Sequence, residues 1–269
     1  MTVAGVGAEL TRAEQPNLPI SAEEIAADAA TCRAAGASIY HLHVRDRDGK
    51  PTMDVATYQR AHEAIREATD IVVQFSSGGA VTDTPEDRLA PLELRPEMAS
   101  LTTGTVNFGD DVFLNPIPLV TRFYRRMREL DIVPEFEIFE PGMIATADKI
   151  YADFGDGHHR HFDFVLGVPG AMPAWSDAIE FLRAHLPEDA TWSATGIGSR
   201  AHLEVADAAI RMGGHVRTGL EDVRFVEPGV LASSNAQLVE RVATMALQRG
   251  RDIASPDRTR AILGLEAVR

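Results

Sequence analysis

Short apolar or β-branched runs alternate along the chain with longer segments of helical periodicity. Residues 71–75 are almost continuously apolar, which is typical of a parallel strand that is buried on both faces. Ser21 and Glu24 fit a capping box, in which two side chains satisfy free backbone N–H groups at the start of a helix. The predicted strands are 2–6, 38–44, 71–75, 98–101, 136–139, 162–168, 191–195 and 215–218. The predicted helices are 21–36, 54–67, 117–130, 144–154, 175–185, 201–212, 235–248 and 258–265, with a further helix opened by Thr84 and Pro85.

The order of these elements predicts the fold class. Alternating strands and helices imply a parallel sheet, because each helix returns the chain to the same end of the sheet. Eight such units in about 250 residues match a closed (β/α)8 barrel, the TIM barrel. A doubly wound open sheet is the alternative, but its dinucleotide-binding versions carry a glycine fingerprint after the first strand, which Gly5 and Gly7 do not supply. With no linker-like stretch in the sequence, we expect a single TIM-barrel catalytic domain over residues 1–269.

A His-x-His pair lies in the second predicted strand. Side chains alternate along a strand, so His41 and His43 point to the same side, about 6–7 Å apart along the chain. This spacing suits two ligands of one metal ion, while two hydrogen-bonded core histidines remain the alternative. Burying two imidazoles without partners is costly, so the pair favours a metal site.

The last predicted strand runs into a second polar cluster. Arg217 lies in the strand, and Glu221 and Asp222 follow its end. In a closed barrel this strand adjoins the first, so a carboxylate here could join the two histidines. Two histidines and one carboxylate are the ligand set of a catalytic zinc with an open position. A solvated loop with an Arg–Glu pair is the alternative interpretation.

Other strand ends carry weaker polar signals. Residues 76–79, Ser-Ser-Gly-Gly, could expose backbone N–H groups to a carboxylate or oxyanion, although the same residues are typical of a plain turn. Ser100 belongs to a polar patch after the next strand. Glu135 and Glu137 lie near another strand, where an inward glutamate needs a compensating charge such as a metal ion or Arg217. Glu9 follows the first strand and precedes a polar loop.

Two further features are given structural interpretations. His158, His159 and His161 lie in a stretch rich in Asp and Gly, and we expect them in an exposed loop rather than in a second metal site. Cys32 lies among alanines in a predicted helix, and we expect a small packed residue rather than a nucleophile.

Composition narrows the class of partner. The chain has 26 Lys and Arg against 40 Asp and Glu, a formal net charge of −14. We therefore expect no nucleic-acid partner and no anionic membrane partner, because both repel a strongly negative protein. No apolar run approaches the roughly 18–20 residues that span a bilayer, and the start of the chain lacks the pattern of a secretory signal. A lone cysteine is compatible with a reducing compartment, so we expect a cytoplasmic protein.

An ordered set of motifs over nearly the whole chain resembles the β-keto acid cleavage enzymes. The motifs are residues 7–9 (GAE), 16–20 (PNLPI), 41–45 (HLHVR), 76–79 (SSGG), 96–100 (PEMAS), 107–109 (NFG), 134–137 (PEFE), 165–170 (VLGVPG), 213–217 (GGHVR) and 221–222 (ED). The resemblance implies a zinc-containing barrel, a homotetramer, and a reaction of a β-keto acid with acetyl-CoA that gives acetoacetate and a new acyl-CoA.

The same resemblance implies roles for individual residues. It implies that zinc is held by His41, His43 and Glu221, and that Asp222 is the general base, coupled to Arg217. It implies that Glu137 is a further active-site carboxylate. Substrate contacts are implied for Ser76, Gly79 and Ser100. Glu9 matches the carboxylate that meets an amino group of the substrate, which implies a cationic β-keto acid such as 3-keto-5-aminohexanoate.

Two other functions remain open from the residues alone. A metal-dependent hydrolase of the amidohydrolase type also uses a His-x-His on a barrel strand and a carboxylate near the last strand. Here the histidine pair falls on the second strand, and no lysine is positioned to bridge two metal ions. The other possibility is a non-catalytic barrel in which zinc staples the first and last strands.

Overall fold

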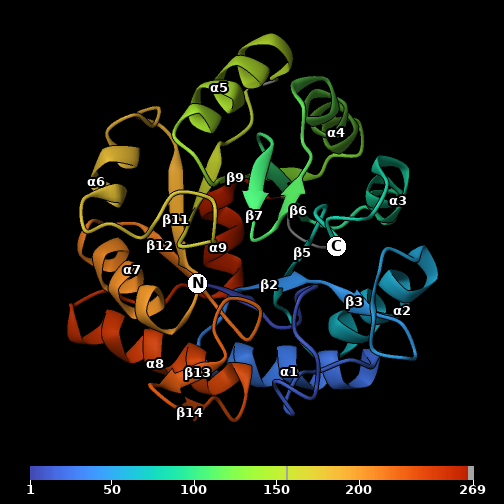
Figure 1. The fold of residues 1–269 in the computed structure, drawn as a ribbon, viewed down its shortest axis with the longest axis vertical. Helices are drawn as coiled ribbons and strands as arrows, with labels where there is room; N and C mark the ends of the chain where they lie inside the picture. The colour runs from blue at the N-terminus through green and yellow to red at the C-terminus, as the bar shows by residue number, and fades with distance from the viewer. Residues whose placement is uncertain (156, 266–269) are drawn as a thin grey trace.

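The computed structural model describes residues 1–155 and 157–265, so residues 266–269 of the expected domain lie outside the described part. At its centre, parallel strands follow one another in chain order to form a closed barrel, and helices pack around it (Figure 1). All eight predicted strands are present, and the predicted (β/α)8 barrel is confirmed. The barrel strands are β1 (Thr2–Ala4), β2 (Ile39–Leu42), β5 (Val72–Phe75), β6 (Met98–Thr102), β9 (Val133–Ile138), β10 (His161–Leu166), β11 (Thr191–Gly196) and β12 (His215–Thr218).

Two helices begin where their predicted capping residues place them, one after Ser21 and one after Thr84. The capping box of Ser21 and Glu24 opens the first helix, which ends at Gly36 in a left-handed conformation. One helix is shorter than the predicted 175–185, because Trp175 lies at the surface before the helix begins. No helix among the described residues has the length and apolar character needed to cross a lipid bilayer. The helices are α1 (Ala22–Ala35), α2 (Val55–Ala68), α3 (Pro85–Leu89), α4 (Ile117–Glu129), α5 (Gly142–Phe154), α6 (Ala178–Arg183), α7 (Ser199–Arg211), α8 (Asn235–Gln248) and α9 (Pro256–Leu263), with a 3₁₀ turn over Ala90–Leu94.

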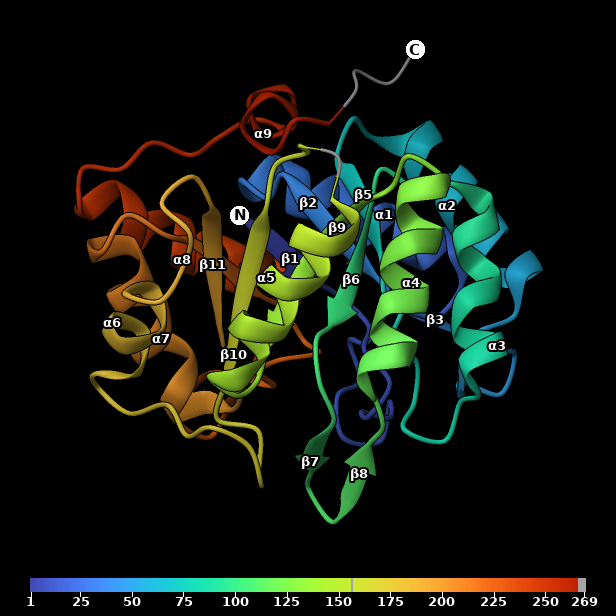
Figure 2. The same ribbon diagram turned by 90° about the horizontal axis from the view of Figure 1, so that it is seen from above.

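Three antiparallel hairpins, absent from the predicted elements, extend the loops that follow barrel strands. They are β3–β4 (Val44–Arg45 and Pro51–Thr52), β7–β8 (Val106–Phe108 and Asp111–Phe113) and β13–β14 (Phe225–Glu227 and Val230–Leu231). Figure 2 shows β7–β8 projecting from the end at which the barrel strands finish, while α9 crosses the opposite end. Leu263 of α9 packs against Ile39 and Val133 at the starts of their strands, which closes the amino-terminal end of the barrel.

The barrel interior is largely polar, whereas the outer faces of the strands are apolar. In β9 the side chains of Phe136 and Ile138 belong to the large core between the strands and the helices. The alternate positions, Glu135 and Glu137, are also buried but point into the barrel, because successive side chains of a strand face opposite ways. Buried charges need partners, so the contents of the barrel define the candidate site.

Candidate active site

Closure of the barrel brings the two histidines and Glu221 together. Strand β1 pairs with both β2 and β12, and Ala4 lies opposite His41. The backbone N–H of Glu221 donates to the Ala4 carbonyl at 3.2 Å, which fixes the loop after β12 beside the end of β2. This close passage requires Gly219, where a Cβ atom would lie 2.1 Å from the Ala4 oxygen.

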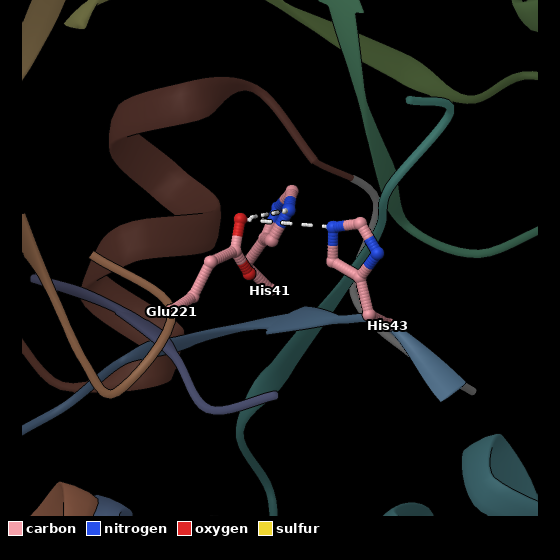
Figure 3. A group of neighbouring side chains, drawn as sticks. All are labelled: His41, His43 and Glu221. Carbon is pink, nitrogen blue, oxygen red and sulfur yellow. Dashed lines mark ion pairs between the residues drawn. The ribbon is translucent and has the colours of Figure 1, made fainter. Parts of the chain in front are cut away.

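The three side chains converge on one point (Figure 3). Oε1 of Glu221 lies 3.8 Å from Nε2 of His41 and 3.6 Å from Nε2 of His43. One ligand atom from each residue lies within 4.8 Å of the other two. The imidazoles are 5.2 Å apart between ring centroids, so both point to the same side, as the period of the strand predicts.

The chemistry of this triad fits a bound metal ion. The carbonyl oxygen of the Gln74 side chain lies 2.6 Å from Nδ1 of His41 and can only accept, so Nδ1 carries the proton and Nε2 keeps its lone pair. Burial lowers the pKa of His41 to about 3 and also lowers that of His43, so both rings are neutral. The second carboxylate oxygen of Glu221, Oε2, is buried without a hydrogen-bond partner. Two neutral imidazoles and a carboxylate are a zinc-type donor set.

Glu221 is also positioned by the loop after β1. Gly7 has a φ of +63°, and a Cβ atom there would lie 2.7 Å from Cγ of Glu221. The side chain of Glu221 therefore rests directly on the Gly7 backbone. Gly7 belongs to the GAE motif, and no role was predicted for it.

Arg217 connects this triad to two further carboxylates. Its Nη2 atom lies 2.5 Å from Oε1 of Glu221 and 3.0 Å from Oδ1 of Asp222, and its Nε donates to Oδ2 of Asp222 at 3.2 Å. On the other side, Nη1 lies 3.5 Å from Oε1 of Glu137. A planar guanidinium can hold several carboxylates at fixed angles, so Arg217 fixes the geometry of the whole group.

Two of these carboxylates have a pKa near neutrality. Burial raises the pKa of Asp222 to about 7, although the adjacent Arg217 opposes the rise. Burial likewise raises the pKa of Glu137 to about 7, against the effects of Arg217 and of the hydroxyl of Thr102, which donates to Glu137 at 2.7 Å. Glu221 behaves differently: Arg217 and the imidazoles outweigh its desolvation and lower its pKa to about 2. A carboxylate with a pKa near the working pH is suited to take and return a proton.

Two acidic residues deeper in the barrel complete the polar interior. Asp163 accepts hydrogen bonds from Ser193 at 2.7 Å and Thr195 at 2.6 Å and lies opposite Glu137 in the register of the strands. Asp163 was missed in the sequence, although its alternation with the outward Phe162 and Phe164 was a usable signal. Glu135 is the second of these residues.

Glu135 overturns the expectation for one histidine. His161 is not in an exposed loop: it is 2% exposed, begins β10, and places Nε2 3.1 Å from Oε2 of Glu135. Burial opposes ionisation of Glu135, but the imidazole of His161 outweighs this effect and lowers the pKa of Glu135. Only His158 and His159, before the strand, are at or near the surface. Cys32 is fully buried in α1, as expected for a packed residue.

The strand-end loops form the walls of a cavity of about 350 Å³ above Arg217 and the triad. Ser76, Gly78 and Gly79 line it, and the hydroxyl of Ser76 accepts the Gly78 N–H at 3.1 Å. Ser100 is buried and is not among the described residues that line the cavity; its carbonyl accepts the Ser77 hydroxyl at 2.6 Å.

The rest of the cavity wall is mostly apolar. Phe108 and Phe113 of the β7–β8 hairpin, Phe139, Val165, Val168 and Ile197 contribute side chains to it. Glu9 is an exposed carboxylate on the loop after β1 and also lines the cavity. The cavity therefore has mostly apolar walls and a charged floor, and the carboxylate of Glu9 lies on its rim.

These features define a class of protein: a TIM barrel whose strand ends carry a His-His-Glu triad that could hold a metal ion, joined through one arginine to a buried carboxylate with a pKa near neutrality. The chain belongs to the β-keto acid cleavage enzyme family, whose family model matches residues 1–265.

Curated relatives agree with this assignment, and a solved structure agrees with the fold. The chain is 45% identical to a 3-keto-5-aminohexanoate cleavage enzyme of Fusobacterium nucleatum over 268 residues, covering 99% of this chain and 97% of that protein. It is 37% identical to a 3-oxoadipate:acetyl-CoA acetyltransferase of Cupriavidus necator, covering 100% of this chain and 95% of that protein. The fold matches the ternary complex of ObcA with a C4-CoA adduct and oxalate with a TM-score of 0.80 at 21% identity, over 93% of this chain and 68% of that chain.

Proposed function

We propose that this enzyme converts a β-keto acid and acetyl-CoA into acetoacetate and a new acyl-CoA, with zinc bound by His41, His43 and Glu221. One observation carries the proposal: the metal-binding triad and the Asp222–Arg217 pair lie on the floor of the same cavity. Membership of the β-keto acid cleavage enzyme family supports the reaction class, and the acetyl-CoA transferase names of relatives support acetyl-CoA as co-substrate.

The donor set of the triad suits zinc, which when bound acts as a Lewis acid toward a keto oxygen and makes the neighbouring carbon more acidic. Gln74 orients the ring of His41 for this purpose, and Gly7 supports the side chain of Glu221. Arg217 holds Oε1 of Glu221 and Oδ1 of Asp222 in place.

Asp222 is the proposed base. Its carboxylate takes a proton from the carbon between the keto and carboxylate groups of the substrate, and Arg217 fixes its orientation through two charge-assisted hydrogen bonds. The deprotonated carbon then attacks the carbonyl carbon of acetyl-CoA. The CoA sulfur then moves to the original keto carbon, and the bond between that carbon and the carboxymethyl carbon breaks, which gives the new thioester. Protonated Asp222 returns its proton to the carboxymethyl carbon, which gives acetoacetate.

All atoms are conserved between the two substrates and the two products, so neither an oxidant nor water is consumed. An acyl-enzyme is also unnecessary. Cys32 is buried in α1, within the core between helices and barrel, and has no access to the cavity.

The cavity favours a β-keto acid with a cationic or neutral tail. Among the described residues that line it, Arg217 is the one guanidinium, and three carboxylates already occupy it. A second carboxylate on the substrate would therefore find no free cation. Glu9 at the rim instead offers a partner to an amino group, as in 3-keto-5-aminohexanoate.

Three further properties are proposed, the first from the family resemblance and the other two from the sequence itself. We expect a homotetramer, a single catalytic domain and a cytoplasmic location.

The amidohydrolase alternative is not favoured. The chain has two lysines, Lys50 and Lys149, and neither is among the described residues that line the cavity. Lys149 pairs instead with Asp153 at the end of α5. No lysine is therefore placed to bridge a second metal ion.

A panel of β-keto acids with acetyl-CoA tests the proposal. Mass spectrometry should detect acetoacetate and the matching acyl-CoA together, in equal amounts, with cationic substrates turned over faster than dicarboxylic ones. Exhaustive chelation should abolish turnover, and added zinc should restore it. Full activity in the chelated protein, or ester hydrolysis without CoA, would refute the proposed function.

A further inference from the structure

Arg88 is a buried arginine behind the cavity wall. It lies near the end of α3 and is 4% exposed. Within the described residues it forms no ion pair with a carboxylate, in contrast to the buried Arg217 and to Arg260, which pairs with Glu97. Desolvation lowers the pKa of Arg88 to about 10, although the more distant carboxylates of Glu137 and Asp83 oppose the shift, so the side chain is still a cation at neutral pH.

The guanidinium of Arg88 joins two walls of the cavity. Its Nε donates to the Ser77 carbonyl at 2.8 Å, Nη1 donates to the Leu114 carbonyl at 3.3 Å, and Nη2 donates to Oδ1 of Asn115 at 2.7 Å. Ser77 belongs to the loop after β5, and Leu114 and Asn115 follow β8 at the base of the hairpin. One side chain therefore fixes the Ser76–Gly79 loop relative to the β7–β8 hairpin.

Two aromatic rings enclose the same cation. The central carbon of the guanidinium, Cζ, lies 4.6 Å from the ring centroid of Phe113 and 5.1 Å from that of Phe123. Phe113 lines the cavity, whereas Arg88 itself is not among the described residues that do so. Neutral acceptors and rings stabilise the cation without cancelling its charge.

A full positive charge beside the Ser76–Gly79 loop affects the binding of anionic ligands. The bare Ser76–Gly79 loop offers dipoles to an anion, whereas Arg88 adds a net charge just behind it. The positive charge matters because the protein as a whole carries −14, which repels anionic substrates. Arg45, in the HLHVR motif, follows a similar pattern on the opposite wall, where it donates to the Gly7 carbonyl at 2.9 Å.

We propose that Arg88 is a positioning residue that holds the Ser76–Gly79 loop and provides the positive charge by which this loop binds the carboxylate of the β-keto acid. This role rests on the proposed function. It goes beyond a purely structural link, because it makes the effect of Arg88 depend on the charge of the ligand.

The experiment compares an anionic ligand with its neutral counterpart. Dissociation constants of acetoacetate and of methyl acetoacetate are measured by titration calorimetry on zinc-loaded wild type, Arg88→Gln and Arg88→Lys. Arg122→Gln is the matched control, because Arg122 is an exposed arginine paired with Glu86 on the outer surface. Zinc content and thermal unfolding of each variant are recorded alongside.

Arg88→Gln should bind acetoacetate on the order of tenfold more weakly, while its affinity for methyl acetoacetate changes less than about threefold. Arg88→Lys should preserve the preference for the anion, and Arg122→Gln should match wild type. Equal losses of affinity for both ligands in Arg88→Gln would show that Arg88 acts only through the structure of the loop, and would overturn the proposal.

If Arg88→Gln fails to fold, Arg88→Lys decides the question: a folded lysine variant that no longer prefers acetoacetate refutes the role of the charge. Wild-type protein that binds no acetoacetate would instead refute the proposed function, and this role with it. Conversion of β-keto acids by wild type, combined with equal losses in Arg88→Gln, would leave the function intact and refute the inference alone.

Discussion

Glu221 and Asp222 are adjacent in the chain, and exchanging each for its amide should separate metal binding from proton transfer. Oε1 of Glu221 faces the two histidines and also contacts Arg217, and Oε2 is buried without a hydrogen bond among the described residues. Asp222 is turned the other way and is bound to Arg217 through both of its oxygens. We therefore expect Glu221→Gln to lose zinc and Asp222→Asn to keep it.

The magnitudes follow from these contacts. Loss of a partner that merely orients a ligand weakens metal binding by about 10–100-fold, so loss of the Glu221 ligand itself should exceed about 100-fold. Loss of a general base costs about 10²–10⁴ in rate, which for Asp222→Asn corresponds to about 3–5 kcal/mol in the barrier. The amide can still accept one hydrogen bond from Arg217, so the free energy of unfolding should fall by no more than about 1–3 kcal/mol.

Metal content after dialysis against graded chelators, together with steady-state rates at saturating zinc, measures both effects. Glu227→Gln is a suitable control, because Glu227 is an exposed glutamate on β13 that pairs with Arg241. It should leave metal content and rate unchanged. Zinc loss from Asp222→Asn, or wild-type zinc affinity in Glu221→Gln, would show that the two roles are assigned the wrong way round.

Three further substitutions test other parts of the structure. Gly7→Ala should displace the Glu221 side chain and lower zinc affinity in a folded protein, measured by competition with a chelator, because the new methyl group would lie 2.7 Å from Cγ in a left-handed conformation. Burial raises the pKa of Asp28 to about 6, so protonated Asp28 stabilises the folded protein relative to the unfolded chain. This stabilisation is complete below about pH 4 and is lost as the pH rises through 6. Between pH 4 and pH 7, the free energy of unfolding of Asp28→Asn, measured with urea, should therefore rise by about 3 kcal/mol relative to that of wild type. A difference between variant and wild type that does not change with pH would contradict this. Glu9→Gln should reduce the preference for cationic over neutral β-keto acids in kcat/KM, and an unchanged preference would exclude Glu9 from recognition of the tail.

Local patterns were enough to predict the barrel, because the residues that indicate a strand or a helix cap lie within a short segment of the chain. The apolar run 71–75 and the capping box at Ser21 are of this kind, and both elements are present within a few residues of the prediction. The hairpins were missed for the opposite reason. Their strands are two or three residues long, too short for a period to emerge, and their pairing depends on the loops that the barrel holds in place.

Residues that depend on contacts between strands were also missed. His161 was assigned to a loop because of the polar stretch before it, although the outward Phe162 and Phe164 place it inside the barrel. Its partner Glu135 is known only from the register of β9 and β10. Arg88 gave no signal at all, since an arginine after Glu86 and Asp87 in a short helix is typical of a surface ion pair.

The charge balance of the barrel floor gives a reason for the ligand set beyond the shape of the triad. Arg217 is in contact with the carboxylates of Glu137, Glu221 and Asp222, all within 3.5 Å. With all three ionised, one guanidinium leaves two negative charges uncompensated in a buried region, where unpaired charge is expensive. That excess equals the charge of one divalent cation. Oε1 of Glu221 faces the two neutral imidazoles as well as Arg217, and Oε2 is buried without a hydrogen bond among the described residues. A divalent ion would therefore complete both the coordination of the triad and the electrostatics of the base beside it.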